Sequence, residues 1–420
     1  MIPGGPTRRG VLAAGLLPFV RPARGAVAAG LTLHRGINAW PWFSLTREYP
    51  APRTDYGLPP FQPERPVPTT HDLARLRSAG FDFLRLPVDP GPFLGLSGPP
   101  RVGLIRDLLN AVAAIRDAGL AVVVNVQANG ATHHWNPDNL YGGPLAPLYP
   151  AYRDFIAELA GRLGAMDTGG IAFEPVNEPP QACGASEWTA LQDELLGLAR
   201  REAAALTLVA GGACGSMVPG LVALDPAPLA RFAPLLFTFH FYEPYLFSHQ
   251  GAPWMREPVY RALNAVPWPA SAGTLARTLA AVRARMDVDT ALPASAKAEA
   301  YAVTEAKLAE YFAADPDRRF IDHRLAAVRG WANRHDIPTH RILMGEFGAL
   351  RSDARYVAAG AADRARYVHD VREAAEANGF AWAFWNLFDG MGLMDDASRR
   401  FDPAILDALG LSLPKGEGPP

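Results

Sequence analysis

The chain has 420 residues, a formal net charge of -2 at pH 7, and hydrophobic residues at 49% of its sequence. A charge this close to zero excludes a protein that binds nucleic acid through a strongly basic surface, so we expect no nucleic-acid partner. The hydrophobic content is typical of a soluble globular enzyme with a sizeable core.

The first 28 residues are expected to be an export signal peptide. Arg8 and Arg9 precede an apolar run over 10–20, and Ala26-Val27-Ala28 forms a small-x-small cleavage pattern. The paired arginines resemble a twin-arginine signal. The apolar run is too short to span a bilayer. We therefore expect a periplasmic or secreted protein, with no stable membrane anchor once the signal is removed.

Eight short apolar segments have the length and composition of β-strands, and most alternate with segments of helical spacing. The strands are expected at 31–38, 81–88, 120–127, 170–178, 206–213, 236–243, 341–348 and 380–388. The helices between them are expected at 69–79, 104–118, 152–166, 187–205 and 356–378. Gly80, Gly119 and Gly379 each stand where a helix should end before the next strand.

This alternation predicts the α/β class, with 29–412 forming a (β/α)8 TIM barrel. An open doubly wound sheet is the competing fold, but no glycine-rich phosphate loop follows the first strand. The proline-rich segment at 50–68 is expected to be an ordered or semi-ordered loop. Residues 413–420 are expected to form a flexible tail.

A long connection at about 245–339 separates the sixth and seventh strands and predicts a helical insertion. Helical stretches lie near 273–286 and 295–313, and a further helix is expected near 320–335. Our hypothesis is that the first two form a lid or wall over the cleft. The alternative is that they pack against the side of the barrel.

The two cysteines, Cys183 and Cys214, follow the fourth and fifth strands. A disulfide and two free buried thiols are both compatible with this spacing. With so few cysteines and no spaced histidine ligands, we expect no metal site and no cofactor.

Two glutamates end strands at the rim where barrel enzymes build their active sites: Glu178 on the fourth strand and Glu346 on the seventh. Two carboxyl groups at one mouth can divide the hydrolysis of a glycosidic bond. One donates a proton to the leaving oxygen and the other attacks the anomeric carbon. A glutamate at the end of a strand can also be a simple salt-bridge partner. The neighbouring residues therefore decide between a catalytic and a structural role for Glu178 and Glu346.

Five motifs in chain order carry a family resemblance. They read GFDFLRLPV at 80–88, FEPVNEP at 173–179, HFYEP at 240–244, GEFG at 345–348 and WAFW at 382–385. Together they resemble glycoside hydrolase family five, the cellulase family, over essentially the whole mature chain. The resemblance implies a retaining hydrolase with Glu178 as acid/base and Glu346 as nucleophile.

Four residues are expected to support this pair. Arg85 points inward and needs a carboxylate partner, which would keep a nucleophile ionised. Asn177 can bond the sugar 2-hydroxyl. His240 and Tyr242 share one face of their strand, and in the family this pair orients the carboxylates. Glu174 is expected to be a structural partner for a buried cation.

Sugar contacts are expected from several other side chains. Trp385 offers a flat face for stacking, and Trp40, Trp42 and Trp254 are expected to line sugar subsites. The family usually has a histidine at the end of the third strand, where this chain has Gln127. His133, His134 and Trp135 follow in the same loop and are candidates to replace that histidine.

The leading interpretation is an exported endo-acting glucanase whose partner is a β-linked oligosaccharide or polysaccharide, acting as a monomer. Mannan and a bacterial exopolysaccharide are rival substrates for the same chemistry. A non-catalytic protein that binds glycans or assists polysaccharide assembly is the alternative from another class, and a metal-dependent barrel hydrolase is more remote.

Overall fold

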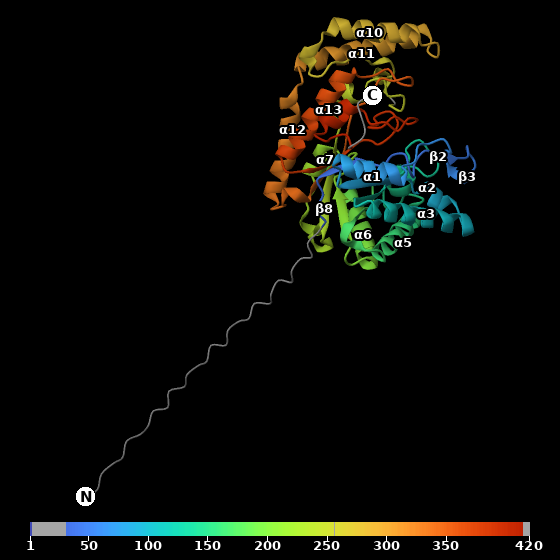
Figure 1. Cartoon of the computed structure of the whole chain (residues 1–420), viewed down its shortest axis with the longest axis vertical. Helices are drawn as coiled ribbons and strands as arrows, with labels where there is room; N and C mark the ends of the chain where they lie inside the picture. The colour runs from blue at the N-terminus through green and yellow to red at the C-terminus, as the bar shows by residue number, and fades with distance from the viewer. Residues whose placement is uncertain (2–30, 256, 415–420) are drawn as a thin grey trace.

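The computed structural model describes residues 1, 31–255 and 257–414, and the predicted signal peptide lies almost wholly outside them. Eight parallel strands close into a barrel with helices around it (Figure 1), which confirms the predicted (β/α)8 fold. The barrel strands are β1 (Arg35–Asn38), β4 (Phe83–Val88), β5 (Ala121–Val126), β6 (Ile171–Glu174), β7 (Thr207–Gly211), β8 (Leu235–Phe241), β9 (Ile342–Phe347) and β10 (Ala381–Phe384).

The strands are buried on both faces, as expected for a parallel sheet covered by helices. Side chains from several strands fill the barrel interior, among them Phe83, Val123 and Leu343. Gly36 makes room for this packing, since a Cβ atom there would lie 2.2 Å from the ring of Phe83. The interior is therefore a packed core beneath the site.

The larger helices around the barrel follow the predicted order. They are α1 (Thr70–Ala79), α3 (Gly98–Asp117), α5 (Tyr149–Gly164), α6 (Ser186–Glu202), α12 (Arg318–Arg334) and α13 (Ala361–Ala377). Gly80, Gly119 and Gly379 adopt positive φ angles of 113°, 77° and 73° at the predicted helix-to-strand joints. Short helices complete the connections: α2 (Gly91–Gly95), α4 (Pro137–Tyr141), α7 (Val218–Val222) and α14 (Pro403–Ala408).

The segment after β1 contains an antiparallel hairpin of β2 (Thr46–Glu48) and β3 (Tyr56–Phe61), where the sequence predicted only a loop. Phe61 is buried and meets Phe43 edge to face, with ring centroids 6.0 Å apart. A two-stranded sheet has free edges, which tolerate prolines that a central strand would not. The high proline content of this segment is therefore the reason that the sequence predicted a loop.

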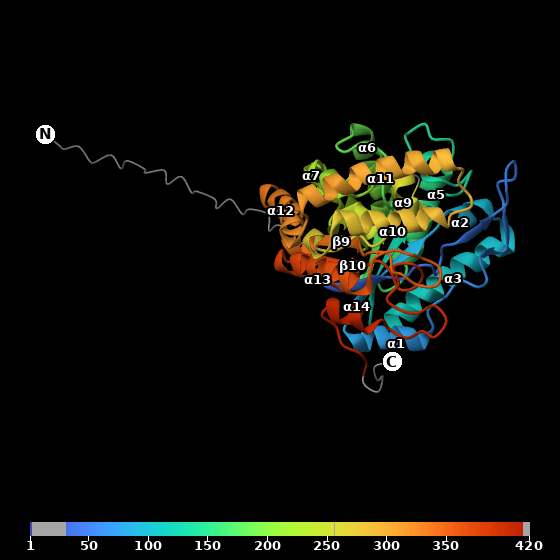
Figure 2. The same cartoon turned by 90° about the horizontal axis from the view of Figure 1, so that it is seen from above.

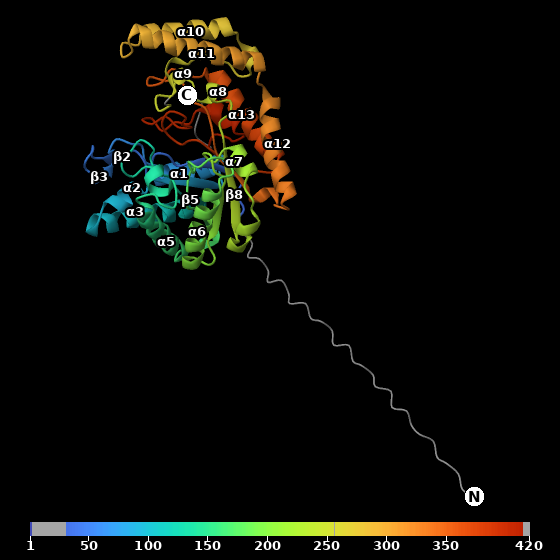
Figure 3. The same ribbon diagram turned by 180° about the vertical axis from the view of Figure 1, so that it is seen from behind.

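The insertion between β8 and β9 is helical, as predicted. It contains α8 (Tyr245–Ser248), α9 (Pro258–Ala262), α10 (Leu275–Asp287) and α11 (Ala294–Ala314). In Figures 1 and 3 the α10–α11 pair forms one end of the molecule, and in Figure 2 it crosses in front of part of the barrel. Buried Trp268 anchors the insertion, because its indole nitrogen donates to Asp370 on α13 at 2.8 Å.

Cys183 and Cys214 form a disulfide, with their Cα atoms 4.8 Å apart. The structure thus decides between the two alternatives that their spacing left open. Throughout residues 31–255 and 257–414, no helix has the length and apolar character needed to cross a membrane.

Candidate active site

The two predicted catalytic glutamates lie at the C-terminal mouth of the barrel. Glu346 is part of β9 and is buried, whereas Glu178 lies four residues beyond the end of β6 and its side chain is 42% exposed. Glu178 has a φ of 43°, a left-handed conformation that is strained for a residue with a side chain. Oxygens of both carboxyl groups and a ring nitrogen of His240 lie within 4.8 Å of one another.

Arg85 on β4 connects these residues through all five of its N–H groups. It donates to both oxygens of Glu174 at 2.8 and 2.9 Å, to Glu346 Oε1 at 2.7 Å, to Asn177 Oδ1 at 2.7 Å and to Asn38 Oδ1 at 2.9 Å. A fully buried guanidinium is stable only when its charge and its donors are satisfied in this way. Glu174 is thus the structural partner that the sequence predicted.

His240 and Tyr242 approach the two glutamates from the end of β8. The His240 Nδ1 atom is 2.9 Å from Glu178 Oε1 and 3.6 Å from Glu346 Oε2. The Tyr242 hydroxyl donates to Glu346 Oε2 at 2.9 Å. Each carboxylate is therefore held in a fixed orientation, as the shared strand face predicted.

The ionisation of these groups is coupled. For Glu346, burial raises the pKa and outweighs the opposing charges of His240 and Arg85. For Glu178, burial acts in the same direction, but the hydrogen bond and charge of His240 outweigh it and hold the pKa below its usual value. Burial alone would lower the pKa of His240, yet the two carboxylates raise it. The three groups share protons as one cluster.

The same cluster has the spacing of a metal site, with one ligand atom each from Glu178, His240 and Glu346. Its surroundings suit a cation poorly, however. Both oxygens of Glu346 already accept hydrogen bonds from Arg85 and Tyr242. The positive charge of Arg85 would also repel a metal ion placed there. The donor set favours acid/base chemistry.

One hollow of about 260 Å³ opens beside Glu178 and is bounded by Trp40, Gln127 and Asn177. The Trp40 ring lies 5.4 Å from the half-buried ring of Trp385, with a tilt of 42°. Trp40 and Gln127, the residue that stands where the family usually has a histidine, thus line one hollow beside Glu178, and Trp385 packs against Trp40.

A second hollow of about 470 Å³ lies against Glu178 and includes Tyr242, His249 and Trp254. Trp254 is 50% exposed, as a stacking platform for sugar requires.

His249 was not identified from the sequence, because it belongs to no motif. Ser248 Oγ donates its single hydrogen to the Tyr242 carbonyl at 2.5 Å, so it must accept the 2.9 Å bond from His249 Nδ1. Burial lowers the pKa of His249 to about 4. The ring is therefore neutral at pH 7 and keeps Nε2 as an acceptor.

His134 and Trp135 do not line either hollow. Trp135 is only 8% exposed, and its indole nitrogen donates to the Thr54 carbonyl at 2.6 Å. His134 packs edge-on against Trp135, at 4.7 Å between ring centroids, while His133 pairs with Glu48 at 3.0 Å. The expectation that these residues replace the family histidine is therefore corrected, because they fix the β2–β3 hairpin to the loop after β5.

The loop that carries Glu178 is tied to its neighbours. The Gly215 amide donates to the Pro179 carbonyl at 2.9 Å, and the Cys214 amide donates to the Gln181 carbonyl at 2.8 Å. The disulfide from Cys183 to Cys214 adds a covalent link between the same two loops. These ties hold the strained backbone at Glu178.

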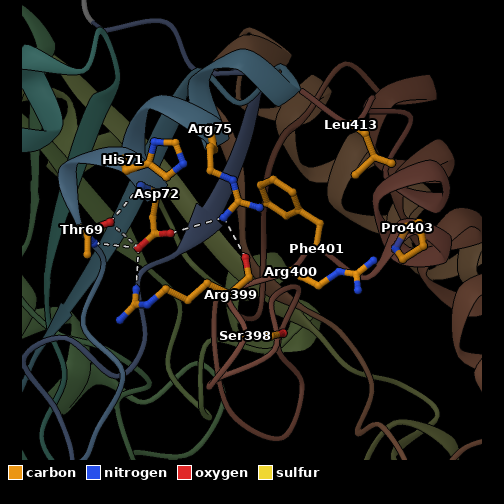
Figure 4. A pocket seen from close by; sticks show the side chains of 10 residues that line it. All are labelled: Thr69, His71, Asp72, Arg75, Ser398, Arg399, Arg400, Phe401, Pro403 and Leu413. Atoms are coloured by element: carbon orange, nitrogen blue, oxygen red, sulfur yellow. Dashed lines mark hydrogen bonds and ion pairs between the residues drawn. The ribbon is translucent and has the colours of Figure 1, made fainter. Parts of the chain in front are cut away.

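Another hollow, of about 460 Å³, has neither catalytic glutamate among its lining residues. Figure 4 shows the residues that line it. Asp72 caps the first turn of α1 through Thr69 and pairs with Arg75 and Arg399. Arg75 also donates to the Arg399 carbonyl at 2.7 Å. These contacts tie the segment before α14 to the start of α1, so we interpret this hollow as a structural joint.

Comparison with known proteins finds two curated relatives. Cellodextrinase A of Ruminococcus flavefaciens is 27% identical over 230 residues, which are 52% of this chain and 61% of the relative. Endoglucanase 3 of Fibrobacter succinogenes is 22% identical over 335 residues, which are 77% of this chain and 47% of the relative. The chain spans less than two thirds of the length of either relative.

Solved structures share the fold. The clostridial cellulose synthase subunit Z of Clostridioides difficile has a TM-score of 0.63 at 20% identity, covering 90% of this chain and 99% of that one. Cel5A of Thermotoga maritima, solved in complex with cellobiose, has a TM-score of 0.61 at 20% identity, covering 90% and 97%. A family model described as "Cellulase (glycosyl hydrolase family 5)" matches residues 54–390, from the β2–β3 hairpin to the loop after β10. Since that match spans most of the chain, the protein belongs to the cellulase family, glycoside hydrolase family 5.

Proposed function

We propose that this protein is an exported retaining glycoside hydrolase that cleaves β-linked glucan, with endo-acting glucanase activity. The observation that carries the proposal is that an oxygen of Glu178 and an oxygen of Glu346 lie within 4.8 Å of each other, while each carboxyl group has its own hydrogen-bond partners. Retaining glycosidases hold their carboxyl groups about 5 Å apart, whereas inverting enzymes need a wider gap for water. The close pair supports double displacement.

In the first step, Glu178 donates its proton to the glycosidic oxygen while the Glu346 carboxylate attacks the anomeric carbon. The bond to the leaving sugar breaks, and the remaining sugar is attached to Glu346 as an ester. In the free enzyme the pKa directions favour Glu346 or His240 as the holder of the shared proton. The first step needs that proton on Glu178, which His240 Nδ1 contacts at 2.9 Å, and its transfer there makes the acid and leaves Glu346 ionised. Arg85 and Tyr242 hold the attacking carboxylate in place.

In the second step, the Glu178 carboxylate takes a proton from water, and the water oxygen attacks the anomeric carbon. The ester to Glu346 breaks and the product keeps its original configuration. Asn177 is fixed by Arg85 at 2.7 Å, which places its amide nitrogen for the sugar 2-hydroxyl. That contact strengthens as the transition state forms.

Substitution of either glutamate tests the mechanism. Glu178→Gln and Glu346→Gln should each lower kcat by several orders of magnitude while the circular dichroism spectrum stays that of the wild type. Added azide should partly rescue Glu346→Ala and give a glycosyl azide of inverted configuration. Rescue with retained configuration only would show that Glu346 is not the nucleophile.

The substrate is best identified from a product profile of the purified mature protein. The panel should contain β-1,2, β-1,3, β-1,4 and β-1,6 glucans, mannan, xylan and a bacterial exopolysaccharide. Both curated relatives bear names of glucan-degrading enzymes, which supports a β-glucan. If the protein cleaves only mannan or only the exopolysaccharide, that polysaccharide is the substrate and the β-glucan proposal is wrong. Loss of activity with a chelator would favour the metal-dependent alternative.

Export is proposed from the arginine pair and cleavage pattern at the N-terminus. Expression of the full chain with and without Arg8→Lys/Arg9→Lys, followed by fractionation, tests it. The wild type should leave the cytoplasm with a shortened N-terminus, while the variant should remain inside at full length. Equal export of both would rule out the twin-arginine route.

A further inference from the structure

A buried carboxyl group beside Glu178 has no part in the proposed mechanism. Asp89 directly follows β4, and only 1% of its surface is exposed. Its Oδ1 atom accepts a hydrogen bond from the Gly91 amide at 2.9 Å. The Thr46 hydroxyl lies nearby, but Oδ2 makes no hydrogen bond of normal geometry. A buried oxygen that has lost its bonds to water is costly unless another donor replaces them.

Asp89 also has no counter-charge. In residues 31–255 and 257–414, no lysine, arginine or histidine forms an ion pair with it, and the ionisable side chain that acts on it is another acid, Glu48. Buried carboxylates are normally paired with a cation or with several donors. The position therefore has an unfilled acceptor, and its charge is uncompensated whenever the carboxyl group is ionised.

Two more polar atoms in the same place are also without partners. Ser44 Oγ and Gln127 Oε1 are both buried and unbonded, and both residues line the 260 Å³ hollow together with Asp89. A cluster of unsatisfied polar atoms is unusual inside a folded protein, where nearly all such atoms find a partner. Three of them around one hollow indicate that a polar ligand completes the site.

The other walls of the hollow show which part of the substrate reaches it. Asn177 and Trp40 line it as well. In the proposed mechanism Asn177 contacts the sugar that Glu346 attacks, and Trp40 is next to the stacking ring of Trp385. The hollow thus belongs to the glycone side, which holds the sugars that stay bound in the first step.

We propose that Asp89, with Ser44 and Gln127, forms a glycone subsite that selects a sugar carrying a hydrogen-bond donor at this position. The donor is a hydroxyl of a neutral sugar or the ammonium group of a deacetylated amino sugar. Both satisfy Oδ2, and the ammonium group also supplies the missing positive charge. This inference rests on the proposed function, because it assumes that the hollow holds a glycan.

The test compares wild type with Asp89→Asn. Asparagine keeps Oδ1 for the Gly91 amide but replaces Oδ2 by an NH₂ group, which cannot accept a hydrogen bond. Substrates are oligosaccharides of the linkage that the wild type cleaves, in a glucose form and in a glucosamine form of equal length. Asp89→Asn should lower kcat/KM by 10- to 100-fold on the substrate that donates to Asp89.

The two donors give different patterns. A loss on the glucose form alone assigns a hydroxyl, and a loss on the glucosamine form alone assigns the ammonium group. Asp225→Asn is the matched control, since exposed Asp225 also accepts a bond from the amide two residues later, at 3.0 Å from Ala227, and lies outside the hollow. Its kcat/KM should equal that of the wild type.

A binding measurement separates the subsite from the chemistry. In the inactive Glu346→Gln background, Asp89→Asn should raise the Kd for the preferred oligosaccharide by the same 10- to 100-fold in calorimetry. Equal kcat/KM and Kd for Asp89→Asn and wild type on both sugars would overturn the subsite while leaving the hydrolase intact. Absence of both hydrolysis and glycan binding in the wild type would overturn the proposed function as well.

Discussion

At the residue scale, Asp89 destabilises the fold in a way that depends on pH. Burial raises its pKa to about 7, against the opposing effects of the Gly91 amide and the nearby Thr46 hydroxyl. The unfolded chain releases the same proton near pH 4. Between these values the folded state holds a proton that the unfolded state has lost, so the free energy of unfolding falls as pH rises.

Asp89→Asn removes this dependence. The variant should gain stability over the wild type progressively from about pH 4 to pH 7 and keep a gain of roughly 3 to 5 kcal/mol above it. The other ionisable side chains near Asp89 are Glu48, Tyr56 and Tyr141, which the variant retains. Denaturant unfolding at pH 4, 6 and 8 measures the difference. A difference that does not change with pH would mean that folding does not raise the pKa of Asp89. A variant that is more stable but less active would identify Asp89 as a residue kept for function.

Some residues of the candidate site could be predicted from the sequence, and others could not. Glu178 and Glu346 were predictable because each ends an apolar run, and Arg85 because a charge inside a strand needs a partner. Asp89 and His249 were not predictable, since their roles depend on what surrounds them. Asp89 lacks a partner for one oxygen, and His249 presents a neutral ring through Ser248. Neither condition leaves a local pattern in the chain.

At the element scale, the disulfide joins the loop after β6 to the loop after β7. It closes a segment with a sequence separation of 31 residues. Removing such a crosslink restores entropy to the unfolded chain, worth about 3 to 4 kcal/mol for this loop length. Cys183→Ser/Cys214→Ser should lower the free energy of unfolding by that order.

Activity of the same variant should change much less. The backbone bonds from Gly215 to Pro179 and from Cys214 to Gln181 remain after the crosslink is lost, so the loop that carries Glu178 keeps two of its ties. We expect kcat at 25 °C to fall by less than tenfold, measured beside chemical unfolding of the same preparation. If the variant keeps its stability but loses its activity, the disulfide positions the loop that carries Glu178 and does not stabilise the fold.

Elements were predictable where one physical requirement dominates. The barrel strands are buried on both faces and therefore form apolar runs, and positive φ at Gly80, Gly119 and Gly379 marks the ends of helices. The β2–β3 hairpin was missed because its partners are held by tertiary contacts, such as Phe61 against Phe43. The cysteine pairing needed the distance between two loops, which spacing along the chain does not give.

At the scale of the whole molecule, the α10–α11 pair faces the loops that follow β8 and β9. A hollow of about 640 Å³ lies between the pair and these loops, lined by Met255, Arg285 and Lys297 among others. Met255 also borders the hollow that contains Glu178 and Trp254. The two hollows therefore share a wall, which is the arrangement expected if the pair extends the cleft for longer glycans.

Deletion of residues 272–314 tests this extension. The Ala270 amide donates to the Pro316 carbonyl at 3.0 Å, so a short glycine linker can rejoin the chain without moving its ends. We expect kcat/KM on long glycans to fall at least tenfold and on short oligosaccharides to stay within twofold.

Because the deletion uncovers apolar side chains such as Tyr260 and Val259, Arg285→Ala/Lys297→Ala provides a second variant with the fold intact. This double variant should also lower the ratio of kcat/KM on long glycans to kcat/KM on short oligosaccharides. If both variants treat long and short glycans like the wild type, the pair is packing on the barrel and has no role in the cleft.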